Sequence, residues 1–390
     1  MTTPKKSKYK NEWMLKYQSI EDTIAEKWGA DIARFFVGER APKIRLVKGR
    51  DKSILLASRF IKDFESLWSF SVRTNIEPYE AYEEVHLTGI HEVLALSILT
   101  LNYDIHMGNV GVVKDKNGND IASVLDCAGA FGSRLGYEKF TRNRMNQPHL
   151  FDGMTKGDPV LPLDIVRGIH GGHYDISSSH FISLEFADKL EAFSSLSKKD
   201  LTQLQRIIHS SAKEIGNAFK HHPDTLGVAK ALGRFGEAVT LNNLGYQMCE
   251  VMDRNLVAGK ELALQIRLQC ALIQSNIDLL DTLLTEHPTL LGKKIKWLTD
   301  DDQPQIHKPT TLYEFVTNQS IKSPEIIFTV IEHQKAREES KKQETWGRKI
   351  AQQARTRNYR TVSEQVRKPH ERHQDLIKKD HKNPPGIHRE

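Results

Sequence analysis

The chain has 390 residues, of which 38% are hydrophobic, and its mean hydropathy is −0.51. This length is enough for two lobes and a further helical domain. No apolar run reaches the roughly 18–20 residues that span a bilayer, and no apolar core follows the N-terminal lysines, so we expect neither a transmembrane segment nor a signal peptide. The three cysteines are odd in number and widely scattered, which excludes a disulfide framework and favours a reducing compartment.

The net charge of +6 is unevenly distributed along the chain. Residues 334–390 contain 16 Lys and Arg and 8 Asp and Glu, a surplus of eight positive charges, so the remainder carries a net charge of −2. The basic character therefore belongs to the C-terminal tail, and the rest of the chain is close to neutral.

The N-terminal part predicts short strands and one helix. Residues 12–17 predict a strand, and Ser19 predicts the N-cap of a helix because Asp22 follows three residues later, close to a capping box. Gly38 is the expected C-cap. Residues 43–47 and 53–61 predict a hairpin of two more strands. The helix is supported by apolar residues at helical spacing, namely Ile20, Ile24, Trp28, Ile32 and Phe35.

Residues 93–101 form an apolar run that predicts a buried helix. The stretch 104–109 follows, and then two apolar runs, 110–113 and 121–125, on either side of an Asn-Gly pair. Asn-Gly between apolar runs predicts a tight hairpin, because both turn positions need a positive φ. Such a hairpin returns Asp126 to the end where Asn109 lies.

The polar residues of this region have the spacing that phosphoryl transfer from a nucleotide needs. Asp104 and Asn109 form the pattern D-x-x-x-x-N, and Asp126 follows the hairpin. One carboxylate orients the acceptor hydroxyl and takes its proton, while an Asn and a second Asp hold Mg²⁺ against the phosphates. The pattern is weak by itself, and the alternative is that Asp104 and Asn109 shape a surface loop while Asp126 caps a strand.

These residues resemble the catalytic core of the protein-kinase superfamily, and especially its atypical HipA-like, lipid-kinase-like and aminoglycoside-phosphotransferase-like branches. Residues 104–109, D-I-H-M-G-N, are similar to the D-x-H-x-x-N loop of those enzymes, and residues 125–131 are similar to their D-x-G metal-binding segment. The resemblance implies Asp104 as catalytic base, Asn109 and Asp126 as ligands of Mg²⁺ or Mn²⁺, and ATP as phosphoryl donor. It also implies an α+β, bilobal protein-kinase-like fold with a reduced N-lobe and a mostly helical C-lobe and extension.

The family also uses a strand lysine paired with a helix glutamate. The resemblance implies Lys16 as the residue that holds the α- and β-phosphates and Glu26 as the residue that orients it, with Glu21 and Asp22 as rival partners. The alternative is a solvated lysine and an ordinary helix charge. The resemblance further implies that the segment from Arg59 to Lys62 is the hinge against adenine, with Arg59, Phe60 and Ile61 as its contact residues.

The sequence departs from the family pattern in two places. Only fifteen residues precede Lys16 and none of them is glycine, so a glycine-rich loop over the phosphates has no room there. Residues 102–104, Asn-Tyr-Asp, stand where ordinary protein kinases have His-Arg-Asp. The first departure leaves the clamping of the phosphates unexplained and keeps open a non-catalytic, pseudokinase-type interpretation.

A basic segment follows Asp126, in the place of a kinase activation segment. Its four cations suit a phosphate-rich ligand such as an inositol polyphosphate, and inositol hexakisphosphate is the activator we expect; the alternative is a solvated basic loop. The four residues are Arg134, Lys139, Arg142 and Arg144. Residues 146–182 predict irregular structure, in which the scattered histidines fit no common zinc site.

The C-terminal half is predominantly helical in pattern. Helices are predicted at 187–196 and 201–208, and a long helix is predicted from about residue 262 through Leu284, ending before Pro288. A polar helix is predicted at 336–360, with disorder from 378 to 390. The expected divisions are a small N-lobe at 1–62, a catalytic core at 63–182, a helical part at 183–300, a linker with short helices at 301–333 and a basic tail at 334–390.

The basic tail has three open interpretations. Each Lys or Arg near an anionic membrane contributes at most about 1 kcal/mol, so the tail could attach reversibly to anionic lipid such as a phosphoinositide. Specific nucleic-acid recognition is not indicated, because no zinc finger, RNP sequence or helix-turn-helix is apparent. The third interpretation is a solubilising extension.

The function expected from this sequence is that of an atypical kinase which transfers the γ-phosphate of ATP to a Ser or Thr hydroxyl of a protein substrate. The whole arrangement resembles the effector kinases, of Legionella type, that bacteria translocate into host cells. That resemblance implies a location in the host cytoplasm, with the tail at a host-derived membrane. The alternatives are a lipid or small-molecule kinase, and an adaptor that binds nucleotide or phosphoinositide without catalysis.

Overall fold

The computed structural model describes residues 13–77, 80–102, 105–127, 129–132, 182–233, 235, 238–293, 295, 310–318 and 323–380, with side chains described up to residue 353. The described residues form an α+β fold. The strands come early in the chain, and helices make up most of the later part. A reduced N-terminal lobe and a mostly helical C-terminal lobe are therefore confirmed.

The first sheet has three antiparallel strands in the order β1-β3-β2. They are β1 (Trp13–Lys16), β2 (Lys43–Lys48) and β3 (Ile54–Arg59), and Lys16 pairs with Leu56 of the central strand. Helix α1 (Ile20–Val37) connects β1 to β2 and packs on the sheet. Both predicted ends of α1 are confirmed, because Ser19 accepts a hydrogen bond from the Asp22 backbone N–H and Gly38 forms the C-cap with a φ of 62°.

The second sheet has the order β4-β5-β6, formed by β4 (Glu65–Ser66), β5 (Val110–Lys114) and β6 (Asp120–Val124). The predicted hairpin of β5 and β6 is confirmed, with Val110 opposite Val124. Its turn differs in detail from the prediction. Only Gly118 has a positive φ, of 86°, and its N–H donates to the Asp115 carbonyl, as in a type I turn that ends in one left-handed residue.

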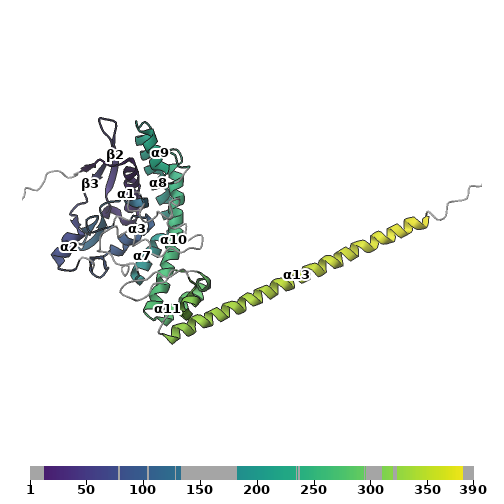
Figure 1. The fold of residues 1–390 in the computed structure, drawn as a ribbon. Helices are drawn as coiled ribbons and strands as arrows, with labels where there is room; N and C mark the ends of the chain where they lie inside the picture. Colours follow the sequence, from purple (N-terminus) through teal and green to yellow (C-terminus); the bar gives the residue numbers. More distant parts are fainter. Residues whose placement is uncertain are drawn as a thin grey trace, which may run out of the picture. The chain divides into compact units, whose positions relative to one another are not determined.

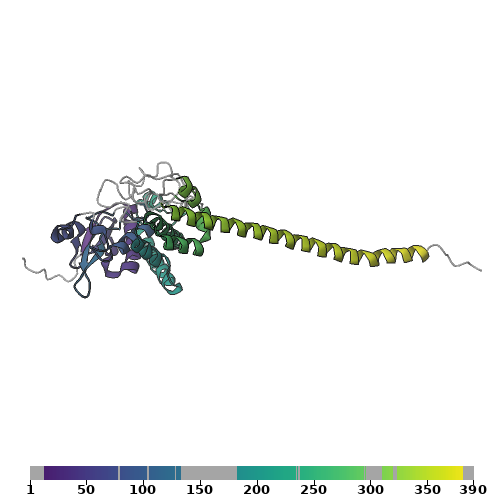
Figure 2. The same ribbon diagram turned by 90° about the horizontal axis from the view of Figure 1, so that it is seen from below.

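Helix α2 (Leu67–Thr74) follows β4, and the predicted buried helix before the hairpin is α3 (Ile90–Leu99). The helical part consists of α7 (Leu184–Ser194), α8 (Lys198–Phe219), α9 (Thr225–Gly233), α10 (Leu244–Ile273), α11 (Ile277–Glu286) and α12 (Leu312–Asn318). The two views show these helices along one side of the strand-containing part (Figures 1 and 2).

The prediction of one long helix through Leu284 was wrong. The helical conformation is interrupted between α10 and α11. Ser275 has a φ of 51° there, and the Asn276 side chain accepts a hydrogen bond from the Leu279 N–H as the N-cap of α11. Apolar periodicity continues across this break because both helices face the same core, so periodicity alone does not reveal it.

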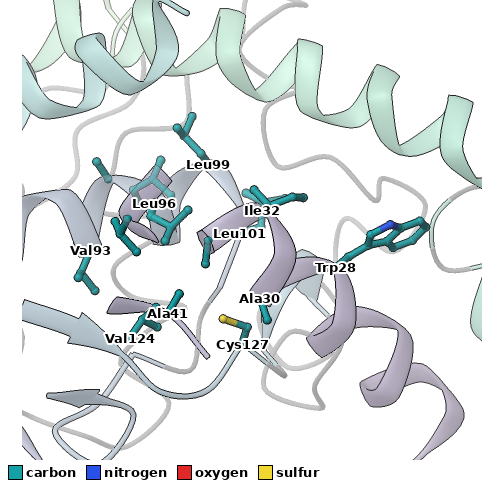
Figure 3. Packing of buried hydrophobic residues seen from close by; sticks show 14 of the residues in the cluster. Trp28, Ala30, Ile32, Ala41, Val93, Leu96, Leu99, Leu101, Val124 and Cys127 are labelled. Carbon is teal, nitrogen blue, oxygen red and sulfur yellow. The ribbon is translucent and has the colours of Figure 1, made fainter. Parts of the chain in front are cut away.

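Helix α13 (Pro324–Asp380) includes the predicted polar helix and continues to residue 380, so the expected disorder from residue 378 was wrong for 378–380. By contacts the chain divides into two compact units, residues 1–326 and 327–390. In the first unit one hydrophobic core joins α1, α3, the second sheet and the helical part. Figure 3 shows side chains of α1, α3 and β6 in this core, together with Cys127.

Candidate active site

Lys16 at the end of β1 is the centre of a cluster of three charged side chains. Its Nζ donates to Oε1 of Glu26 at 2.6 Å and to Oδ2 of Asp126 at 3.2 Å. The three residues come from β1, from α1 and from the segment that follows β6. The fold therefore brings together a lysine and two carboxylates that are up to 110 residues apart in the sequence.

Burial makes this cluster electrostatically strong. The Glu26 side chain is fully buried, whereas the Lys16 and Asp126 side chains are 19% and 18% exposed. Burial alone would lower the pKa of Lys16, but the charges of Asp126 and Glu26 outweigh it and raise that pKa above 10.5. Burial, and after it the charge of Asp126, raises the pKa of Glu26 above 4.5 despite the opposing effect of Lys16.

The local structure explains why these side chains meet. The pairing of β1 with β3 fixes Lys16, and the capped first turn of α1 places Glu26 on the second turn. Gly29 then lets α1 approach the segment after Asp126 closely. A Cβ at Gly29 would lie 2.8 Å from the Cβ of Ala130 and 2.9 Å from the Cβ of Cys127, which is closer than real Cβ contacts.

Asn109 lies opposite Leu125, the residue that precedes Asp126, at the end of the hairpin. The Leu125 N–H donates to the Asn109 carbonyl at 2.7 Å, one pair beyond Val110 and Val124. An Asn and an Asp supply the oxygen ligands that Mg²⁺ and Mn²⁺ prefer. Among the described residues no group of three or more His, Cys, Asp and Glu could hold a metal. The roles of Asn109 and Asp126 as ligands of Mg²⁺ or Mn²⁺ therefore stay a prediction.

Asn102 is a structural residue of the site that the sequence analysis did not select. It is 3% exposed, and its side-chain Nδ2 donates to the Asp126 backbone carbonyl at 3.3 Å. Its neighbour Leu101 has a φ of 51°, an unusual backbone conformation for a buried leucine. The sequence offered one sign of this role, because Asn102 is the polar residue that directly follows the apolar run 93–101. Asp104, the predicted catalytic base, lies outside the described residues, so its role stays a prediction.

On α1, the carboxylate that Lys16 contacts is Glu26 and neither of the alternative predicted partners, Glu21 and Asp22. Asp22 belongs to the first turn of α1, where its backbone N–H donates to the Ser19 hydroxyl, and Glu21 is its neighbour in that turn. The four predicted polyanion-binding residues, Arg134, Lys139, Arg142 and Arg144, lie outside the described residues.

The predicted hinge residues lie elsewhere on the strand-containing part. Arg59, Phe60 and Ile61 line a cavity of about 630 Å³ between the end of β3, the start of β2 and the β5–β6 hairpin. Neither Lys16 nor Asp126 lines this cavity. Arg59 stands directly opposite Lys43 in the sheet, and Phe60 is 53% exposed. The structure thus does not join these three side chains to the lysine cluster, and their contact with adenine stays a prediction.

No protein-family model and no curated protein matches the chain. A solved structure, described as the crystal structure of a Helicobacter pylori proinflammatory kinase, CtkA, is similar to it over 67% of this chain and 95% of that chain, with 13% sequence identity and a TM-score of 0.34. A similarity this low establishes neither the fold nor the activity of this chain.

Proposed function

We propose that this chain is an ATP-dependent phosphotransferase of an atypical kinase type. The observation that carries the proposal is Lys16, held between a fully buried Glu26 and Asp126. Asn109 lies opposite Leu125, the residue before Asp126, at the end of the hairpin. A lysine fixed in this way is a point charge for phosphate oxygens, and the Asn–Asp pair supplies ligands for the accompanying cation.

In this proposal each residue has one role. Lys16 binds the α- and β-phosphates of ATP, and Glu26 keeps the ammonium group in place. The acceptor oxygen forms a bond to the γ-phosphorus as the bond from that phosphorus to the departing ADP oxygen breaks. Asp104 orients the acceptor hydroxyl and takes its proton. Asn109 and Asp126 would hold Mg²⁺ or Mn²⁺, which offsets the negative charge of the phosphates.

Transfer of labelled phosphate from ATP, with Mg²⁺ or Mn²⁺, tests the proposal. Lys16→Ala and Asp126→Ala should each lower the rate by at least about a hundredfold, because both groups act on charge that develops in the transition state. Lys48→Ala is the matched control, since this exposed lysine lies at the end of β2. Equal rates in the wild type and in all three variants would refute the phosphotransferase assignment.

The second candidate is an adaptor that binds nucleotide or phosphoinositide without transferring phosphate. The lack of any glycine among residues 1–15 favours it, because these residues cannot form a glycine-rich loop over the phosphates. Calorimetric binding of ATP that depends on Lys16, together with an absence of transfer to any acceptor, would support the adaptor over the kinase.

An activating polyanion belongs to the same proposal. Four cations at positions 134, 139, 142 and 144 are the sequence feature that motivates it, and inositol hexakisphosphate is the ligand that we propose. The rate of ATP hydrolysis or autophosphorylation should rise when this compound is added. An unchanged rate would remove the activator from the proposal and leave the lysine cluster unaffected.

The preferred acceptor is a Ser or Thr hydroxyl of a protein, because the large helical part offers surface on which a macromolecule could dock. A lipid or small-molecule hydroxyl is the alternative acceptor. We further propose that the chain acts as a bacterial effector in the host cytoplasm, and that its basic tail contacts anionic lipid. The sequence resemblance supports the effector role, and the surplus of eight positive charges in residues 334–390 supports the lipid contact.

A further inference from the structure

The middle of helix α1, which carries Glu26, is buried on all sides. Residues 23–30 are buried without exception, although an ordinary surface helix buries only one stripe. The sheet covers one side of α1, while α8, α9 and the segment after β6 cover others. Trp28 shows the depth of this packing, since it is fully buried and its ring meets that of Phe235 edge to face at 5.2 Å.

Lys27 follows Glu26 and is a buried cation with three partners. It is 4% exposed, and its Nζ lies 3.1 Å from the Ile44 carbonyl of β2, 2.9 Å from Oδ2 of Asp31 and 2.8 Å from Oε2 of Glu214. A buried charge is tolerated only where it is paired and hydrogen-bonded, and Lys27 meets that condition through α1, β2 and α8 together.

Glu214 of α8 has a second contact that fixes its place. Its other oxygen, Oε1, accepts a hydrogen bond from the Leu46 backbone N–H of β2 at 3.1 Å. One carboxylate of the helical part thus joins the second turn of α1 to the edge strand of the first sheet. We call this set of contacts the Lys27–Glu214 bridge.

We propose that Glu214 is a positioning residue for the candidate active site: through the Lys27–Glu214 bridge, helix α8 holds α1 in the orientation in which Glu26 reaches Lys16. This inference rests on the proposed function for its catalytic meaning, but the positioning itself does not.

The geometry of a helix supplies the reason. Glu26 and Lys27 are adjacent and so point about 100° apart around the α1 axis. Any rotation or shift of α1 that withdraws Glu26 from Lys16 also pulls Lys27 away from Ile44 and Glu214. The two contacts therefore form and break together, and the bridge stabilises the conformation that presents Lys16.

The variants Glu214→Ala and Glu214→Gln test this inference, with Lys213→Gln as the control on the exposed neighbouring position. The affinity for an ATP analogue that cannot be hydrolysed should fall about tenfold in Glu214→Ala, because apparent affinity falls with the fraction of molecules in the competent conformation. The affinity of Glu214→Gln should lie between those of the wild type and Glu214→Ala, since the oxygen of the glutamine amide still accepts a hydrogen bond from Lys27. The control should bind as the wild type does.

A double-mutant cycle identifies the route of the effect. Lys27→Met removes the cation at nearly constant length and should weaken binding by a similar factor. Lys27→Met combined with Glu214→Ala should then weaken it no further, because both changes break the same bridge. Full multiplication of the two effects would overturn the inference.

Hydrogen exchange separates positioning from a general loss of stability and requires no bound nucleotide. In Glu214→Ala, amides of α1 should exchange faster while those of α10 keep their rates; equal acceleration in both helices, or none in α1, would overturn the inference. A wild-type protein that binds no nucleotide would refute the proposed function, and the exchange rates of α1 would still decide whether Glu214 positions this helix.

Discussion

At the scale of single residues, Gly29 allows a close approach of two segments beside the candidate site. It has no Cβ, and so α1 can lie against the segment that follows Asp126. Sequence periodicity gives no sign of this requirement, because a glycine inside a helical pattern is usually only a weak position.

Gly29→Ala should destabilise the protein by about 1–3 kcal/mol, the usual cost of overpacking a core, even though alanine is the better helix former. Urea unfolding monitored by circular dichroism measures the difference. Gly233→Ala is the matched control, since a Cβ there meets no atom within 4 Å. A Gly29→Ala variant as stable as the control variant would contradict the close approach.

At the scale of elements, Glu92 joins three segments. It forms ion pairs with Arg40, which follows α1, and with Lys189 of α7, while Glu92 itself lies on α3. Burial alone would raise the pKa of Glu92, but its hydrogen bonds and charge contacts with Arg40 and Lys189 outweigh burial and lower the pKa below 4.5.

Glu92→Gln should therefore lower the free energy of unfolding by about 1–3 kcal/mol at pH 7, as expected for hydrogen bonds between charged groups. Because the pKa of Glu92 is lower in the folded chain than in the unfolded chain, its stabilising contribution is complete above about pH 4.5 and is lost as the pH falls through the folded-state pKa. The gap between wild type and variant in urea unfolding should narrow at low pH. A gap that stays constant with pH would contradict the ion pairs.

The β5–β6 hairpin is the element that sets Asn109 opposite Leu125, the residue before Asp126, and its turn depends on Gly118 at a φ of 86°. Gly118→Ala should lower the free energy of unfolding by about 1–2 kcal/mol, because an L-residue with a Cβ disfavours the left-handed conformation. Gly118→Asn should cost less, since asparagine tolerates that conformation. Thermal unfolding of the two variants provides the comparison, and equal costs would show that the conformation of the turn is not responsible.

The extent of successful sequence prediction depends on how local each feature is. The caps of α1 and the β5–β6 hairpin depend on residues close together in the sequence, and both were predicted. The Lys27–Glu214 bridge joins residues 187 positions apart, and no periodicity or spacing encodes such a contact. The residues of the candidate site also fall into two groups, those selected from the sequence and those found only in the structure. Resemblance selected Lys16, Glu26, Asn109 and Asp126, whereas Asn102 and Gly29 became apparent only from the packing of distant segments.

At the scale of the whole molecule, residues 327–390 form a compact unit separate from residues 1–326. Every residue from 341 to 353 is exposed, including Trp346 at 69%. None of the described helices is long and apolar enough to cross a membrane.

Removal of residues 334–390 should leave the melting temperature nearly unchanged, because none of the described side chains from 334 to 353 is buried. The same truncation should abolish sedimentation with vesicles that contain phosphoinositide, and the binding of the full chain should weaken as salt rises. Sedimentation of the truncated chain at the level of the full chain would exclude the tail as the lipid contact.

The burial of all three thiols gives this protein an internal reporter. Cys127, Cys249 and Cys270 are at most 9% exposed, and burial raises the pKa of Cys127 well above its usual value and that of the other two to about 11. An alkylating reagent therefore has no ready target while the chain stays folded. Cys127 belongs to the segment that carries Asp126 and packs against Gly29 of α1, so its labelling rate should measure how often this segment and α1 separate, without any substrate or assay of turnover.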